Sequence, residues 1–242
     1  AIKVLHEHLA HHDMAAFLNE ARAIAHLRHP HIVQVLDFGI EGTTPFLVLD
    51  YAPGGNLREH YPKGTPIPLD IVLAYVMQIA DALQYAHQEK LIHRDIKPEN
   101  LLLGRNNEVL LSDFGIAIVI QSSRKPQVQD TAGTIAYMAP EQLRGKPTPA
   151  SDQYALGIVV YEWCCGDRPF HGTFAELSSQ HLFVPPPPLR EKVPAIPPTV
   201  EHVVLKALAK DPKERFASVQ AFAAALEEAV KAESSGRTLS VL

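Results

Sequence analysis

Hydrophobic positions along the chain follow two different periods, and the change between them divides the sequence into two regions. The first region contains short apolar or alternating stretches, each typical of a strand. These stretches are residues 1–5, 31–40 and 45–51. A helix is predicted between the first two stretches, because Phe17, Ala21 and Ile24 recur at helical spacing after a candidate cap at Asp13. The pattern predicts a small lobe of strands and one helix.

Helical periodicity dominates after the turn-forming sequence Pro53-Gly54-Gly55. Residues 72–86 carry a long apolar stripe with polar residues outside it, which predicts an amphipathic helix. Similar stripes predict helices at 200–208 and 219–226. Seven prolines between 185 and 198 predict an extended surface connection instead. The alternative interpretation of that segment is a binding site for a proline-recognising partner.

The composition is that of a folded globular protein, with 46% hydrophobic and 20% charged residues in 242. A net charge of -5 argues against nucleic acid as a partner, because the chain has no basic excess to displace counterions. No apolar run approaches the roughly 20 residues that cross a bilayer, and no signal peptide opens the sequence. Cys164 and Cys165 are neighbours, which favours reduced buried thiols. We therefore expect a cytoplasmic chain, or the cytoplasmic part of a membrane-anchored protein.

Candidate chemistry is concentrated in two motifs, His93-Arg94-Asp95-Ile96-Lys97-Pro98-Glu99-Asn100 and, thirteen residues after its asparagine, Asp113-Phe114-Gly115. Phosphoryl transfer from ATP needs a carboxylate for the hydroxyl proton, a cation beside the moving phosphoryl group, and oxygen ligands for Mg²⁺. The residues that match these needs, in order, are Asp95, Lys97, Asn100 and Asp113.

With Ala1-Ile2-Lys3 before these motifs and Ala139-Pro140-Glu141 after them, the chain resembles a eukaryotic-like (Hanks-type) Ser/Thr protein kinase domain of the bacterial type. The resemblance extends from Ala1 to about Val230. It implies an α+β, two-lobed protein kinase-like fold with a small strand-plus-helix N-lobe and a larger, mostly helical C-lobe. The expected parts are an N-lobe with hinge at 1–52, a C-lobe at 53–232 and a flexible tail at 233–242.

The resemblance implies a role for each residue of the two motifs. Asp95 would be the base that receives the substrate hydroxyl proton, and Lys97 would lie against the γ-phosphate of ATP. Asn100 and Asp113 would be the Mg²⁺ ligands, since both offer hard oxygen donors. The expected substrates are serine and threonine hydroxyls of proteins.

The nucleotide-binding residues are implied in the same way. Lys3 would hold the α- and β-phosphates and would be held by Glu20, which shares the inward helical face of Phe17. The connector at 49–52 would meet the adenine edge. The full expected set is Ala1, Lys3, Leu49, Asp50, Ala52, Asn56, Glu99, Asn100, Leu102 and Asp113.

The stretch between the second motif and Ala139-Pro140-Glu141 resembles an activation segment. Thr131 is the expected site of activating self-phosphorylation, with Ser122 and Ser123 as competitors. Arg94 would grip that phosphate. Thr134 would bond near the catalytic residues.

Three further residues have structural roles by the same resemblance. Glu141 and Arg215 would form a buried ion pair, and Asp152 would bond the backbone around His93. A separate group of imidazoles invites a metal-site interpretation, but it lacks a cysteine or paired acid at helical spacing, so we favour a solvated loop. This group is His6, His8, His11 and His12.

The sequence departs from the family at its start, because no glycine-rich loop precedes Ala1. We expect a truncated kinase in which ATP affinity and turnover both suffer. Two functions follow, an active Ser/Thr protein kinase and a catalytically impaired kinase-like binding or scaffold module. A small-molecule phosphotransferase is disfavoured by Thr134 and Ala139-Pro140-Glu141, which resemble a docking platform for a protein substrate.

Overall fold

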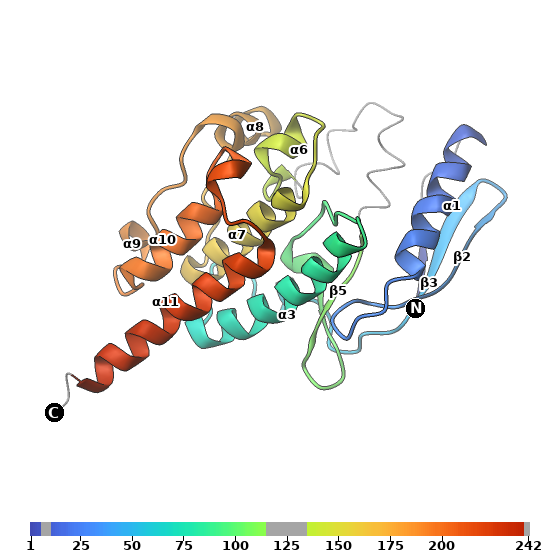
Figure 1. The fold of residues 1–242 in the computed structure, drawn as a ribbon. Coiled ribbons are helices and arrows are strands. Elements are labelled where there is room, and N and C mark those ends of the chain that lie inside the picture. The colour runs from blue at the N-terminus through green and yellow to red at the C-terminus, as the bar shows by residue number, and fades with distance from the viewer. Residues whose placement is uncertain (6–10, 115–134, 240–242) are drawn as a thin grey trace.

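The computed structural model describes residues 1–5, 11–114 and 135–239. Figure 1 shows a small lobe, made of strands and one long helix, beside a larger helical lobe. This arrangement confirms the predicted α+β, two-lobed fold class.

The small lobe is built around an antiparallel sheet of order β1-β3-β2. Its strands are β1 (Ile2–Val4), β2 (Val35–Glu41) and β3 (Thr44–Leu49), and helix α1 (His11–Ala25) packs against them. The helix begins two residues before the predicted cap at Asp13, a difference within the usual uncertainty of a helix end. Phe17 and Ala21 are fully buried between α1 and the sheet, as their spacing predicted.

Alternation along β1 decides where Lys3 points. Ile2 and Val4 are 71% and 46% exposed, whereas Lys3 is half-buried and lines a cavity between the lobes. Successive side chains of a strand point to opposite faces. The strand therefore directs Lys3 toward the larger lobe, where Asp113 lies.

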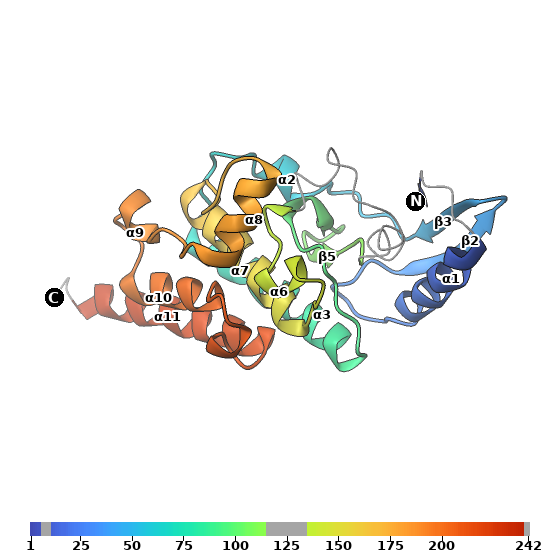
Figure 2. The same ribbon diagram turned by 90° about the horizontal axis from the view of Figure 1, so that it is seen from above.

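The larger lobe consists mainly of helices, and three of those that the structure describes, α3 (Leu69–Gln88), α7 (Pro149–Cys165) and α11 (Val219–Leu239), are long. Its other described helices are α2 (Leu57–His60), α6 (Pro140–Leu143), α8 (Phe174–Phe183), α9 (Leu189–Lys192) and α10 (Pro198–Ala207). The short elements are the turns η1 (Pro98–Asn100) and η2 (Pro212–Glu214) and the paired strands β4 (Leu101–Leu103) and β5 (Val109–Leu111). Figure 2 shows β5 close to the side of the lobe that faces the small sheet.

Helix α7 forms the centre of this lobe. Fourteen of its seventeen residues are buried, and it contacts α3, α10 and α11. A helix that is buried on nearly all sides must be surrounded by other elements. Thr148 and Ser151 form a capping box at its start, and Gly166 ends it with a left-handed backbone (φ +79°).

Two predicted boundaries differ from the structure. The proline-rich segment contains a short helix, α9, because Leu189 is fully buried and fixes one turn there. Helix α11 continues to Leu239, whereas a tail was predicted from residue 233.

The adjacent cysteines are free, as predicted, with Cys164 buried and Cys165 partly buried. Within the ranges given above, no helix has the length and apolar character needed to span a bilayer.

Candidate active site

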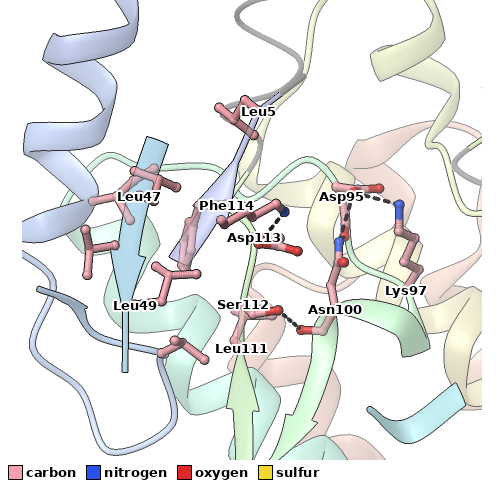
Figure 3. Close-up of a pocket in the computed structure, with 14 residues that line it drawn as sticks. Leu5, Leu47, Leu49, Asp95, Lys97, Asn100, Leu111, Ser112, Asp113 and Phe114 are labelled. Carbon is pink, nitrogen blue, oxygen red and sulfur yellow. Dashed lines mark hydrogen bonds and ion pairs between the residues drawn. The ribbon is translucent and has the colours of Figure 1, made fainter. Parts of the chain in front are cut away.

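A cavity lies between the two lobes and is lined from both sides (Figure 3). The small lobe contributes Lys3 and Leu49 from its sheet. The larger lobe contributes polar residues of the loop before β4 and of the segment after β5. These are Asp95, Lys97, Asn100, Ser112 and Asp113. The fold thus brings both predicted motifs and Lys3 to one site.

The loop that carries Asp95 is held by Asp152 on α7. Asp152 accepts hydrogen bonds from the backbone N–H of His93 (2.9 Å) and of Arg94 (2.8 Å), as predicted, and from the ring of His87 (2.7 Å). Arg94 has φ +69°, a conformation that non-glycine residues seldom adopt. These bonds from a buried helix hold that strained backbone in place.

His93 links the two motifs through its ring. The side chain is fully buried, its Nε2 donates to the carbonyl of Ser112 (2.8 Å), and its Nδ1 accepts from the N–H of Asp95 (3.2 Å). The ring also lies 4.5 Å from that of Phe114, between centroids. Burial lowers the pKa of His93, although Asp152 and Asp95 oppose that shift, so the neutral ring keeps one defined tautomer.

Asp95 forms a cluster with two other predicted catalytic residues. Its Oδ2 lies 2.8 Å from Nζ of Lys97 and accepts from the amide nitrogen of Asn100 (2.9 Å). The same nitrogen of Asn100 also donates to the Asp95 carbonyl (2.7 Å). Both bonds use the amide nitrogen, so the amide oxygen, which is the atom that ligates metals, takes no part in them.

Asp113 is tied to the opposite lobe. Its Oδ1 lies 2.7 Å from Nζ of Lys3, and its backbone has φ +62°. Ser112, the residue before it, bonds the Asn100 carbonyl through both its N–H (2.9 Å) and its hydroxyl (3.1 Å). These contacts set Asp113 beside Asn100, as Figure 3 shows.

The predicted ion pair between Lys3 and Glu20 is wrong for this structure. Glu20 lies 4.0 Å from Nη1 of Arg94, while Lys3 pairs with the nearer carboxylate of Asp113. Burial raises the pKa of Glu20 and the charge of Arg94 opposes that rise. The charge of Arg94 is therefore partly neutralised by Glu20 in this structure. Its Nε is buried without a hydrogen-bond partner in the described part of the chain.

The predicted nucleotide residues divide into two groups. Leu49 lines the cavity, whereas Ala1, Asp50, Ala52 and Leu102 are not in its lining. Leu49 N–H donates to the carbonyl of Ala1 (2.7 Å), which closes the end of the sheet. The roles of these residues stay predictions.

Asn56 and Glu99 have other partners in the structure. Asn56 caps α2, where its oxygen accepts from the N–H of Glu59 (2.9 Å). Glu99 accepts from Nε of Arg58 (2.9 Å). Their predicted contacts with a nucleotide are untested by this arrangement.

Sequence reasoning missed a charged network beside the site. Arg58 binds Glu162 through Nη1 (2.6 Å) and the hydroxyl of Tyr137 through Nη2 (2.6 Å), in addition to Glu99. Glu162 is 3% exposed within an otherwise apolar run of α7. A buried carboxylate in such a run needs a cation as its partner. The position of Glu162 within the apolar run could therefore have predicted a cationic partner from the sequence.

The predicted pair of Glu141 and Arg215 is confirmed. Two parallel bonds of 2.8 and 2.9 Å join the carboxylate to the guanidinium, and Ser151 donates a third (2.8 Å). Burial alone would raise the pKa of Glu141, but Arg215, a backbone hydrogen bond and the hydrogen bond from Ser151 together outweigh burial, so the pKa is lowered. The pair anchors the start of α6 to the end of the lobe.

Several predictions concern residues or side chains outside the described part of the chain. These residues are His6, His8, His11, His12, Ser122, Ser123, Thr131 and Thr134. Within the described part, no group of three or more His, Cys, Asp or Glu residues is arranged to hold a metal.

Comparison with known proteins gives a consistent result. Residues 1–226 match the family described as the protein kinase domain. The chain is 35% identical to serine/threonine-protein kinase PrkC of Bacillus subtilis over 96% of its length, and 39% identical to serine/threonine-protein kinase Pkn1 of Myxococcus xanthus over 95%. It is 36% identical to serine/threonine-protein kinase PknL of Mycobacterium tuberculosis over 94%. The matches span 37%, 34% and 58% of those proteins, so the chain is shorter than each.

Proposed function

Because the chain belongs to the protein kinase domain family, we propose that it is the catalytic domain of a Ser/Thr protein kinase. It transfers the γ-phosphate of ATP to serine or threonine hydroxyls of protein substrates. One observation carries the proposal: the hydrogen-bonded cluster of Asp95, Lys97 and Asn100 lines the same cavity as the Lys3–Asp113 pair. A purely structural loop would have no chemical need for that set.

The residues present fit a nucleotide and a divalent cation, which the family uses. Asn100 and Asp113 offer hard oxygen donors, the type that Mg²⁺ prefers. Two protein ligands suffice, because Mg²⁺ usually keeps waters and takes phosphate oxygens as further ligands. When bound, the cation would neutralise charge on the phosphates.

In this proposal, Asp95 receives the proton of the substrate hydroxyl. Lys97 and Asn100 both bond its Oδ2, which fixes the carboxylate and leaves Oδ1 outside these two bonds. Lys97 brings a positive charge to the same point, where charge develops during transfer. Lys3 and Asp113 neutralise each other in this structure, so phosphates would draw Lys3 away from Asp113.

The test is phosphate incorporation by the purified chain with Mg-ATP, measured as intact mass. Asp95→Asn should reduce the rate by about 10²- to 10⁴-fold, the usual contribution of a positioned base. Asp70→Asn is the matched control, because Asp70 lies at the start of α3, outside the cavity lining. An unchanged rate in Asp95→Asn would refute the role of Asp95.

Self-phosphorylation at Thr131 and a cytoplasmic setting belong to the same proposal. The Nε of Arg94, which has no hydrogen-bond partner in the described part of the chain, supports the first, and the free thiols of Cys164 and Cys165 support the second. Mapping the added phosphate, with Thr131→Ala alongside, tests the phosphosite. Phosphate that persists at full level in Thr131→Ala would assign another residue.

A second candidate is the catalytically impaired scaffold. In this structure Glu20 lies beside Arg94 and not beside Lys3. This observation favours the scaffold, because active kinases need the Lys–Glu pair. The same incorporation assay separates the two functions. Absence of any phosphate transfer in the parent chain would support the scaffold.

A further inference from the structure

The connection between α8 and α9 is the feature that the proposed function leaves unused. It contains four consecutive prolines, Pro185–Pro188, with Phe183 two residues before the run and Arg190 two residues after it. Figures 1 and 2 show this connection at the outer edge of the larger lobe, away from the small lobe. Nothing bound there would cover the cavity between the lobes.

The proline run has the geometry of a polyproline II helix. Each proline fixes its own φ, and each residue before a proline is restricted to extended conformations. The two ends of the run confirm this, with φ -94° and ψ 124° at Val184 and φ -57° and ψ 133° at Pro188. Polyproline II has three residues per turn, so Pro185 and Pro188 lie on one edge, about 9 Å apart.

That edge faces solvent. Pro185 and Pro188 are both exposed, whereas Pro186 and Pro187 between them are only partly exposed. Phe183 is 71% exposed and Val184 43%, so the edge continues into an apolar patch.

The run is also anchored to the body of the protein. The hydroxyl of Tyr161 on α7 donates to the carbonyl of Pro187 (3.0 Å), and Leu189 is fully buried. A partner would bind a ridge that already has its bound shape, which lowers the entropic cost of association.

Backbone carbonyls and one charged side chain along the ridge can also bind a partner. In the described part of the chain, no hydrogen bond involves the carbonyl of Pro185 or Pro186. Arg190 is exposed two residues after Pro188 and adds a positive charge at the end of the ridge. The pattern is two prolines at i and i+3 followed by a cation, which is complementary to an aromatic groove that ends in a carboxylate.

We propose that Phe183–Arg190 is a docking ridge for a separate protein domain that recognises polyproline II through an aromatic-lined groove. The ridge binds through Pro185 and Pro188, and Arg190 pairs with an acidic side chain at the end of the groove. This interaction does not depend on phosphoryl transfer, because the ridge is distant from Asp95 and Asp113.

The experiment is a calorimetric titration of the whole chain with three purified probes, an SH3, a WW and an EVH1 domain. At least one probe should bind with a Kd of about 1 mM or tighter. The double variant Pro185→Ala/Pro188→Ala should weaken that binding at least tenfold. Pro194→Ala is the matched control, because Pro194 is exposed but lies outside the run.

Further controls keep the outcome interpretable. Each variant must unfold at the temperature of the parent, and Arg190→Ala provides a second variant that leaves the prolines intact. Asp113→Asn should bind as the parent does, which separates docking from catalysis. Absence of binding by all three probes, or equal binding by parent and double variant, would overturn the proposal. Self-association that the double variant abolishes would assign the ridge to a second copy of this chain and overturn the choice of partner.

Discussion

At the residue scale, buried charges of the larger lobe are matched by partners distant in sequence. Arg215 has a fully buried side chain, and its partner Glu141 lies 74 residues earlier. Glu162 meets Arg58 across 104 residues. Removing one member of such a pair leaves the other buried without compensation, which is costlier than losing both.

Arg215→Leu should therefore lower the free energy of unfolding by about 3–5 kcal/mol. The reason is the uncompensated carboxylate of Glu141 that remains. Urea denaturation of the variant and the parent measures the change. The double variant Glu141→Gln/Arg215→Leu should lose clearly less than the single variant; an equal or larger loss would contradict the argument.

The same pair predicts a pH dependence of stability. The folded pKa of Glu141 lies below the ordinary value of 4.5 because Arg215 and the other hydrogen-bond donors to this carboxylate together outweigh burial. A carboxylate with a lowered folded pKa stabilises the protein above its unfolded pKa and loses that stabilisation as pH falls through the folded value. Urea denaturation at pH 7 and at several values below 4.5 should show this loss in the parent. The free energy of unfolding should change less with pH in the double variant Glu141→Gln/Arg215→Leu than in the parent.

The Glu141–Arg215 pair of the larger lobe was predictable, whereas the Arg58–Glu162 pair and the partner of Glu20 were not. The motif resemblance placed Asp152 and the Glu141–Arg215 pair correctly, since their neighbours are rigid buried helices. Glu20 sits on α1, which packs on the small sheet, so its partner depends on how the two lobes meet. A sequence pattern contains no information on that distance.

At the element scale, backbone conformation decides where the central helix stops. Gly166 ends α7 with φ +79°, and a Cβ there would lie 3.0 Å from the carbonyl carbon of Gly64. Gly42 also has a positive φ, +64°, but a Cβ there would meet nothing within 4 Å. Comparing substitutions at the two glycines therefore distinguishes the cost of backbone strain from the cost of steric contact.

Gly166→Ala should destabilise the protein more than Gly42→Ala. Both alanines must adopt a left-handed backbone, which costs roughly 1–2 kcal/mol. Only the Cβ at position 166 would also press against the backbone of Gly64. Thermal unfolding of the two variants beside the parent measures the difference. Equal shifts in Tm would show that the contact with Gly64 relaxes without cost.

Elements with a clear period were predictable from sequence, and short elements without one were not. The amphipathic stripe at 72–86 became α3, and the stripe at 219–226 became part of α11. Strands β4 and β5 have three residues each, and all six are apolar, so the sequence shows no alternation there. Helix α9 depends on one buried side chain, Leu189, whose surroundings come from distant parts of the chain.

At the scale of the whole molecule, the two lobes meet through charges that can exchange partners. Lys3 pairs with Asp113, and Glu20 pairs with Arg94. An active kinase requires the strand lysine to pair with the helix glutamate. Catalysis would then require α1 to bring Glu20 from Arg94 to Lys3.

Glu20→Gln should consequently lower kcat/KM for phosphoryl transfer at least about tenfold, or about 1.4 kcal/mol of transition-state stabilisation. The variant leaves the sheet and the Asp95 cluster intact. Steady-state assays with ATP measure the effect, and Asn19→Asp, on the exposed side of α1, controls for a changed charge on the helix. An unchanged kcat/KM would mean that catalysis does not require a Lys3–Glu20 pair.

Asp152 holds the loop 93–100, the proposed catalytic loop, and this attachment affects the order in which parts of the molecule unfold on heating. The amide protons of His93 and Arg94 are held by a residue of α7, and α7 lies at the centre of the larger lobe. Those protons can exchange with solvent only when that centre opens, so they should be among the slowest to take up deuterium. A catalytic loop attached only at the surface would unfold locally, and the enzyme would lose activity at a temperature well below that at which its core unfolds. Here the catalytic loop should persist until the lobe itself unfolds.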